Sequence, residues 1–143
     1  MPRAEMSGLC LNRRLRDRMV QHARKADPME AVGILGGLPP RQVVEVIPLG
    51  NLAGPGQFLA DPYEQYRAEQ ALRSAGLTPL AIYHSHPAGG VAPSALDVRF
   101  AAGLGLVQIV IALDCPGGAA VDLKAFRLRE GRPVEVDLSL TDQ

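Results

Sequence analysis

The sequence predicts an α/β fold of the α+β-like kind, in which a mixed, curved β-sheet is flanked by helices. Short apolar runs with strand character outnumber the segments with helical periodicity. Hairpin-like connections, such as residues 114–119, join neighbouring runs and argue against a doubly wound parallel sheet. A length of 143 residues, 47% of them hydrophobic, fits a single domain over residues 1–143 with a real core.

The first expected element is an amphipathic helix at residues 12–26, with Asn12 as its N-cap. Its apolar side recurs at helical spacing through Leu15, Met19, His22, Ala23 and Ala26. The polar side carries six basic residues against Asp17 alone, and we interpret it as a solvated helix face, with docking of an acidic partner as the alternative. A single histidine without a companion is weak evidence for a metal site, so His22 is expected to be structural or exposed.

Three strands and a second helix are expected next. The strands are separated by proline and glycine turn signals and span residues 31–37, 41–49 and 56–60. The helix is indicated by the capping residue Asp61, a proline directly after it, and Glu64 three residues after the cap. It is expected to run to about Ala75, because Gly76 is a typical C-terminal stop.

The second half of the chain supplies further strands. A buried strand is expected within residues 78–86, with two histidines at its C-terminal end. The remaining apolar runs with strand character lie at residues 106–113, 120–128 and 133–138. These runs complete the predicted mixed sheet.

Composition excludes several classes of function. Fifteen basic and fifteen acidic residues cancel, so there is no bulk electrostatic argument for nucleic acid or a membrane surface as partner. The start of the sequence has no apolar signal core, and no apolar run is long enough to span a membrane, so a cytoplasmic protein is expected. Cys10 and Cys115 form no CxxC motif and are interpreted as small buried hydrophobes, with a disulfide or a surface thiol as alternatives.

The stretch HSHPAGGVAPSALD, residues 84–97, concentrates potential metal ligands. On a strand, residues two apart point to the same face, so His84 and His86 can bind one ion while Ser85 points away. The prolines and glycines that follow can return the chain, and with it Asp97, to the histidines. Ser94 and Asp97 are also spaced as an acidic capping box at the start of a helix through about residue 101. An open zinc site with three protein ligands and a simple helix cap are both compatible with this pattern.

The pattern H-x-H-P-x5-P-S-x2-D, preceded upstream by Glu30 before an apolar strand, resembles the JAMM signature of the MPN (Mov34-type) metalloprotease family. The resemblance covers about residues 8–137 and is closest to the compact bacterial and archaeal members. It implies the MPN/JAMM architecture, a cytidine-deaminase-like fold, and one zinc ion per chain bound by His84, His86 and Asp97. It also implies that Glu30 holds the attacking water and that Ser94 assists the developing oxyanion.

The resemblance further implies a zinc metallopeptidase of the isopeptidase type. The expected partner is a ubiquitin-like or sulfur-carrier protein, cut after its C-terminal Gly-Gly, whose narrow tail can lie along an exposed strand edge. Two alternatives stay open: an MPN domain that has lost catalysis and serves as a scaffold or docking module, and a general zinc peptidase.

Overall fold

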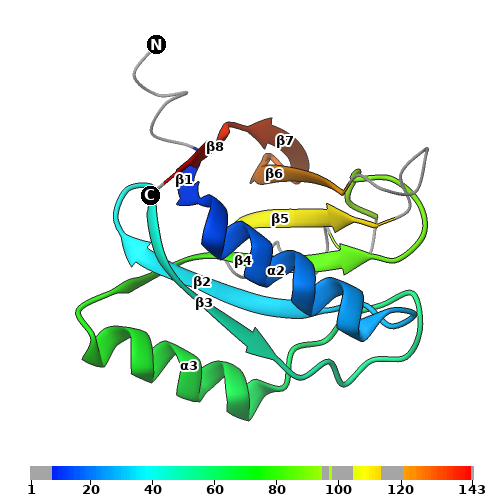
Figure 1. Cartoon of the computed structure of the whole chain (residues 1–143), viewed down its shortest axis with the longest axis horizontal. Coiled ribbons are helices and arrows are strands. Elements are labelled where there is room, and N and C mark those ends of the chain that lie inside the picture. The colour runs from blue at the N-terminus through cyan, green and yellow to red at the C-terminus, as the bar shows by residue number, and fades with distance from the viewer. Residues whose placement is uncertain (1–7, 95–96, 98–104, 114–120, 143) are drawn as a thin grey trace.

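The computed structural model describes residues 8–94, 97, 105–113 and 121–142, which form one eight-stranded sheet and two helices (Figure 1). The elements follow in the order β1 (Leu9–Asn12), α2 (Arg13–Ala26), β2 (Val32–Leu38), β3 (Gln42–Leu49), α3 (Pro62–Ser74), β4 (Thr78–His86), β5 (Val107–Ala112), β6 (Asp122–Arg129), β7 (Arg132–Val136) and β8 (Leu138–Thr141). The sheet order is β7-β6-β5-β4-β2-β3-β1-β8. Pairing is parallel for β4 with β5 and for β1 with β3 and β8, and antiparallel elsewhere. The predicted mixed sheet is therefore confirmed.

The sheet curls until its two edges approach each other. β7 and β8 are the two edge strands, although only Asp137 separates them in the sequence. The carbonyl of Asp137 accepts a hydrogen bond of 2.8 Å from the backbone N–H of Leu9 in β1. Strong right-handed twist brings distant edges of a many-stranded sheet together in this way, and Figure 1 shows β6, β7, β1 and β8 at the same end of the molecule. The predicted curvature is confirmed.

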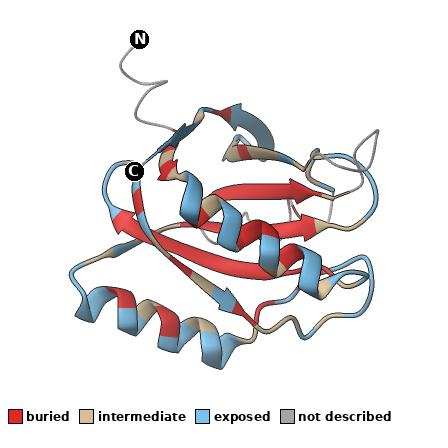
Figure 2. Cartoon of the chain, in the orientation of Figure 1, coloured by how far each residue is buried: buried red, intermediate tan, exposed pale blue. Residues whose placement is uncertain are grey.

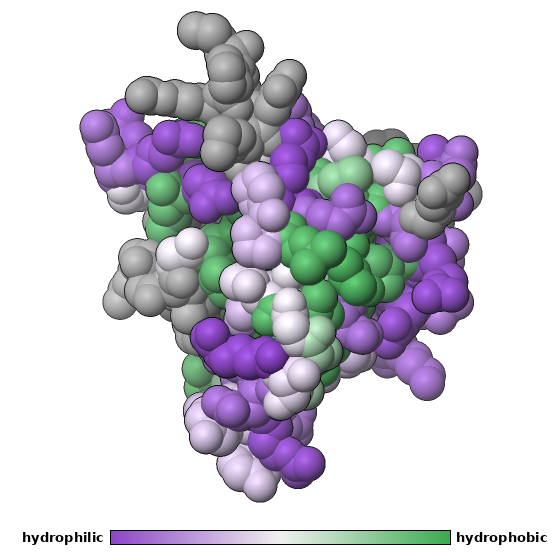
Figure 3. Space-filling view, turned by 90° about the vertical axis from the view of Figure 1, so that its left-hand side faces the viewer, coloured by the Kyte–Doolittle hydropathy of each residue, from purple (hydrophilic) through white to green (hydrophobic). Residues whose placement is uncertain are grey.

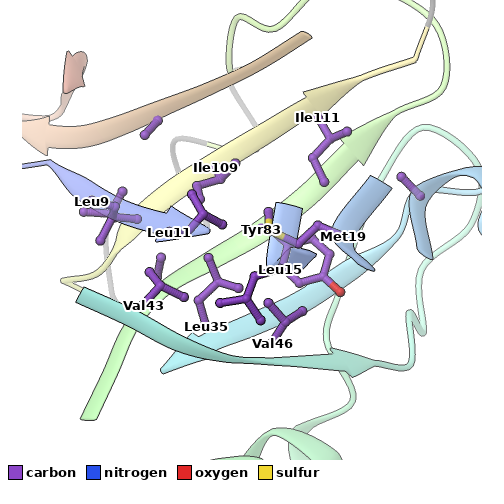
Figure 4. Close-up of a cluster of buried hydrophobic side chains, with 14 of the residues drawn as sticks. Leu9, Leu11, Leu15, Met19, Leu35, Val43, Val46, Tyr83, Ile109 and Ile111 are labelled. Carbon is purple, nitrogen blue, oxygen red and sulfur yellow. The ribbon is translucent and has the colours of Figure 1, made fainter. Parts of the chain in front are cut away.

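Helix α2 lies across one face of the curled sheet and closes its main core (Figure 4). Asn12 caps the helix, because its Oδ1 accepts a 2.8 Å hydrogen bond from the N–H of Leu15. The side chains that α2 buries are those of Leu15, Met19, Val20 and Ala23. Leu15, Met19 and Ala23 pack against apolar residues of the strands, so the predicted amphipathic pattern accounts for the placement of this helix.

His22 is structural, as the sequence predicted. It is half-buried, and its Nδ1 lies 2.7 Å from the hydroxyl oxygen of Tyr83, which is fully buried in β4. Burial lowers the pKa of His22 and raises the pKa of Tyr83. The pair therefore satisfies two polar groups inside the core between α2 and the sheet.

Helix α3 covers the opposite face through a smaller core that contains Ala68, Leu72 and residues of β2 and β4. Asp61 caps α3, because its Oδ1 accepts hydrogen bonds from the N–H groups of Tyr63 and Glu64. Glu64 does not close a capping box with Asp61. Its Oε1 accepts a 2.8 Å hydrogen bond from the N–H of Gly50, so this carboxylate anchors the segment that leads into the helix.

Several predicted bounds need correction. Residues 56–60 form no strand; Ala60 makes only an isolated antiparallel bridge to Asn51. The expected strand at 133–138 is two strands, β7 and β8, and β1 was not predicted, because four residues give too little periodicity to recognise. The expected connection at 114–119, Cys115 and most of the helix after Ser94 lie outside the described residues. Cys10 is a half-buried free thiol.

Burial is highest in the middle of the sheet, where β5, nearly all of β2 and residues 81–85 of β4 are buried (Figure 2). Figure 3 views the end of the molecule away from the C-terminal ends of β4 and β5, and there a band of apolar surface lies between hydrophilic side chains. Among the described residues, neither helix is long and apolar enough to cross a membrane.

Candidate metal centre and active site

The candidate site lies at the C-terminal end of β4, an interior strand between β2 and β5. His84 and His86 point to the same face, because they are two residues apart on this strand. Ser85 points the other way, as predicted, and its side chain is buried. The edge strands of the sheet are β7 and β8, whereas β4 has a paired neighbour on each side. A substrate tail therefore cannot pair with β4 itself, although the sequence analysis expected it to lie along an exposed strand edge.

The strand register explains how Glu30 reaches the histidines. In the antiparallel pair β2 and β4, Val32 lies opposite His84 and Gly33 opposite Tyr83. Continuing this register by two residues places Glu30 opposite His86, and opposite residues of a pair project to the same face. Glu30 is accordingly buried beside the histidines, which the sequence alone could not show.

Four side chains converge at this point: Glu30, His84, His86 and Asp97 each place one nitrogen or oxygen atom within 4.8 Å of the others. Nε2 of His84 and Nε2 of His86 are 3.3 Å apart. Oδ2 of Asp97 lies 3.0 Å from the first nitrogen and 3.1 Å from the second. Two ligands of a tetrahedral zinc ion with bonds of 2.0–2.1 Å are separated by about 3.3 Å. The three atoms therefore have close to the spacing of three zinc ligands.

The tautomer of His86 also fits a metal site. Its Nδ1 donates a 2.8 Å hydrogen bond to the carbonyl oxygen of Gly90, which leaves the lone pair of the neutral ring on Nε2, the atom that faces the site. Among the described atoms, Nδ1 of His84 and Oε1 of Glu30 are buried without a hydrogen-bond partner. Buried polar atoms are normally paired by hydrogen bonds. Because these two atoms are not, local hydrogen bonding does not explain how the two side chains are oriented. Their orientation instead directs Nε2 of His84 and the carboxylate of Glu30 toward the shared site.

The electrostatics of the site suit a cation. Burial raises the pKa of Asp97, but its hydrogen bonds to His84 and His86 outweigh burial and hold that pKa well below its ordinary value, so the carboxylate is ionised. Burial lowers the pKa of His84, which favours the neutral imidazole that a metal requires. When Nε2 of His86 takes up a proton it can donate a hydrogen bond to Asp97, and this bond raises the pKa of His86. Burial raises the pKa of Glu30, which moves this carboxylate toward the range useful for proton transfer.

Ser94 and Asp97 form a reciprocal capping box. The N–H of Ser94 donates to Oδ2 of Asp97 at 2.8 Å, and Oγ of Ser94 accepts from the N–H of Asp97 at 3.1 Å. Asp97 therefore acts as a helix cap and also approaches the histidines. Its Oδ2 atom accepts from the N–H of Ser94 and lies close to Nε2 of both His84 and His86. The hydroxyl of Ser94 keeps its own O–H available for donation.

Two contributors to the site carried no signal in the sequence. The ring of Phe58 stacks on the imidazole of His84, with centroids 4.3 Å apart and an angle of 18° between the planes. Asn51 donates a 2.9 Å hydrogen bond from Nδ2 to the backbone carbonyl of Glu30. Both residues lie between β3 and α3, more than twenty residues from the histidines, and only the folded chain brings them there.

Comparison with known proteins identifies the family of this chain. The family model of prokaryotic homologs of the JAB domain matches residues 12–129, and the chain therefore belongs to this family. A protein of Thermus thermophilus named as a probable TtuB-protein conjugate cleaving protease is 42% identical over 80 residues, 54% of this chain and 53% of that protein. The CysO-cysteine peptidase of Mycobacterium tuberculosis is 30% identical over 131 residues, 87% of this chain and 86% of that protein.

Solved structures support the same fold. Protein DSY2949 from Desulfitobacterium hafniense is 35% identical, with a TM-score of 0.86 over 94% of each chain. AF2198, a JAB1/MPN domain protein from Archaeoglobus fulgidus, is 21% identical, with a TM-score of 0.61 over 92% of this chain and 99% of that one. The second likeness concerns the fold alone, and it confirms the MPN/JAMM architecture that the sequence resemblance implied.

Proposed function

We propose that this chain is a zinc-dependent isopeptidase or peptidase that hydrolyses the amide bond after the C-terminal Gly-Gly of a ubiquitin-like or sulfur-carrier protein. The observation that carries the proposal is the convergence of Glu30, His84, His86 and Asp97 within 4.8 Å in a chain of the prokaryotic JAB family. The names of two relatives, a protease for protein conjugates of TtuB and a CysO-cysteine peptidase, support cleavage between a carrier protein and the group attached to it.

In this proposal His84, His86 and Asp97 hold one zinc ion per chain. Three protein ligands leave a fourth position open, as in other catalytic zinc sites. The bound ion supplies Lewis-acid chemistry that polarises the scissile carbonyl and acidifies water. No described cysteine lies near these residues, so the donor set is two imidazoles and a carboxylate, which suits zinc.

Glu30 is proposed as the proton carrier of the reaction. It accepts a proton from the attacking water and delivers that proton to the nitrogen of the leaving amine. Its buried position beside His86 supports this role, and its raised pKa supports it too, because a higher pKa makes the carboxylate a stronger base in the first step and lets it keep the proton until the second. Ser94 is proposed to donate a hydrogen bond from its hydroxyl group to the carbonyl oxygen of the substrate as negative charge develops on that oxygen.

The substrate proposal is tested with a carrier protein that ends in Gly-Gly and is extended by one amide-linked residue. The zinc-loaded enzyme should cut after the second glycine, mass spectrometry should locate the cut, and a chelator should stop the reaction. Replacing the last glycine of the carrier with valine should abolish cleavage and leave enzyme-bound zinc unchanged, because a side chain beside the scissile bond would collide with the site.

The controls separate the alternatives. Binding of the carrier without any product after long incubation would favour a scaffold or docking module. Equal cleavage of unrelated unfolded peptides would identify a general zinc peptidase and exclude the carrier assignment.

A further inference from the structure

The peptide unit that joins Glu30 to Ala31 is held by two side chains from different parts of the chain. Its carbonyl oxygen accepts a 2.9 Å hydrogen bond from Nδ2 of Asn51. Its N–H donates a 2.8 Å hydrogen bond to Oγ of Ser85. The C=O and N–H of one trans peptide point in opposite directions, so the two side chains hold this plane from opposite sides. We infer that Asn51 and Ser85 are positioning residues that fix Glu30 against the metal ligands.

The orientation of Glu30 depends on its backbone. Oε1 of Glu30 is buried and has no hydrogen-bond partner, so this oxygen is not fixed by a bond of its own. Glu30 and Ala31 also precede β2, which begins at Val32, and so they lie beyond the regular strand. A carboxylate that must meet reacting atoms within fractions of an ångström needs support from neighbouring groups. The Asn51 and Ser85 hydrogen bonds provide it.

Asn51 uses all of its hydrogen-bonding capacity. Besides donating to Glu30, its Nδ2 donates to the carbonyl of Gln57 at 3.1 Å. Its Oδ1 accepts from the N–H groups of Ala53 and Leu59, both at 2.9 Å. These three bonds order residues 50–61, which we call the 50–61 hairpin, closed by the bridge from Asn51 to Ala60. Of these four hydrogen bonds of the Asn51 side chain, the one to the carbonyl of Glu30 reaches outside the hairpin.

The 50–61 hairpin reaches the metal ligands as well. Phe58, buried on the hairpin, stacks on the ring of His84. The base of the hairpin is anchored to α3, because the N–H of Gly50 donates to the carboxylate of Glu64. The carbonyl of Gly50 accepts from the N–H of Asp61 and closes the hairpin. One amide therefore links the segment that packs on a proposed zinc ligand to the segment that carries the proposed base.

Ser85 supplies the second half of the support from the histidine strand. It is fully buried between His84 and His86 in sequence, and its backbone N–H donates to the carbonyl of Ala31 at 3.0 Å. Backbone and side chain of Ser85 thus both bind Ala31. This arrangement ties the position of Glu30 directly to the strand that carries the two imidazoles.

The inference rests on the proposed function, and Asn51→Asp tests it. The aspartate keeps the two acceptor bonds that order the hairpin but loses the N–H donors to Glu30 and Gln57. We expect kcat to fall about 10- to 100-fold, the usual cost of disturbing a group that supports a metal-site residue. KM and bound zinc should stay within about two-fold of wild type, and the N–H groups of Ala53 and Leu59 should stay protected from hydrogen exchange.

The matched control is Asn12→Asp. It introduces the same charge at an asparagine that also accepts a hydrogen bond from backbone, but at the start of α2, where aspartate is an equally good cap. Its kcat should equal that of wild type. If Asn51→Asp turns over like this control, Asn51 only orders the hairpin and the inference is wrong. If zinc is lost in proportion to kcat, the residue supports the metal ligands and not Glu30, and the inference is also wrong.

A crystal structure of Asn51→Asp gives a readout without activity. Glu30 should be displaced relative to His84 and His86, and an unmoved Glu30 would overturn the inference even if no carrier is ever cut. Failure of the proposed function looks different, because zinc-loaded wild type would then release no product. Should Asn51→Asp not fold, Ser85→Ala carries the same expectation of lower kcat with zinc retained, and wild-type kcat in that variant would refute the positioning role.

Discussion

Replacing Glu30 by glutamine separates chemistry from stability. The amide has nearly the volume of the carboxylate, so the buried space beside His86 stays filled and the zinc ligands are untouched. It cannot accept the proton that the proposed mechanism transfers. The three proposed zinc ligands are the atoms of His84, His86 and Asp97 that lie 3.0–3.3 Å apart, and Glu30 is not one of them. Glutamine at position 30 should therefore leave zinc binding largely intact.

The two effects have opposite signs. Removing an acid-base group costs about 10²- to 10⁴-fold in rate, or roughly 3 to 5.5 kcal/mol of transition-state stabilisation. Stability of the zinc-free protein should change the other way. Burial raises the pKa of Glu30, so the folded state binds a proton more tightly than the unfolded state, and this residue destabilises the fold increasingly as pH rises above its ordinary pKa of 4.5. Glutamine has no charge to desolvate.

The assay follows both quantities in one variant. Single-turnover cleavage of the extended carrier by Glu30→Gln should be slower by at least about 10²-fold, with zinc content by mass spectrometry close to that of wild type. Urea unfolding of the zinc-free proteins at pH 7 should give Glu30→Gln equal or greater stability than wild type, and the difference should vanish near pH 4. Near-normal turnover, or loss of zinc together with activity, would refute the assignment of Glu30 as the proton carrier.

Three further predictions concern the metal and the core. Purified protein should hold about one zinc per chain; His86→Ala and Asp97→Asn should lose it, while full retention in both would exclude them as ligands. Because the hydrogen bond with Asp97 raises the pKa of His86 above 6.5, protons should displace zinc from wild type at a higher pH than from a site with an ordinary histidine, as a pH titration of released zinc would show. Gly33→Ala should lower the free energy of unfolding by about 1–3 kcal/mol, because the added Cβ would overlap the buried ring of Tyr83. Gly54→Ala, where a Cβ meets open space, should be neutral in the same urea titration.

Much of the fold could be predicted because its signals are local. The helix at residues 12–26 has a cap and a regular apolar face, and the strand at 78–86 has a buried apolar run, so both were placed within a residue of their observed bounds. Strand β1 was missed, and β8 was merged with β7 into one expected strand. Both β1 and β8 have only four residues, and they pair with each other across the sheet, which the local sequence does not show. The run at 56–60 has strand composition, but Asn51 forms hydrogen bonds that order it as a hairpin instead.

The candidate site was predictable in part for the same reason. His84, His86, Ser94 and Asp97 lie within fourteen consecutive residues, and their spacing is compatible with convergence on one ion. Glu30 was proposed only through the family resemblance, because its approach depends on a strand pairing over fifty residues apart. The support from Asn51 had no sequence signal at all, since an asparagine between a strand and a helix is common in loops.

The register between β2 and β4 is the property on which the site depends. Gly33 lies opposite Tyr83, and the tyrosine ring occupies the space that any side chain at position 33 would need. A slip of one residue would turn Glu30 to the other face of the sheet, because side chains alternate along a strand. A slip of two would bring the side chain of Ala31 or Leu35 against the tyrosine ring and move Glu30 away from His86. The contact between a glycine and a tyrosine in the core therefore selects the register that places the proposed base beside the proposed zinc ligands.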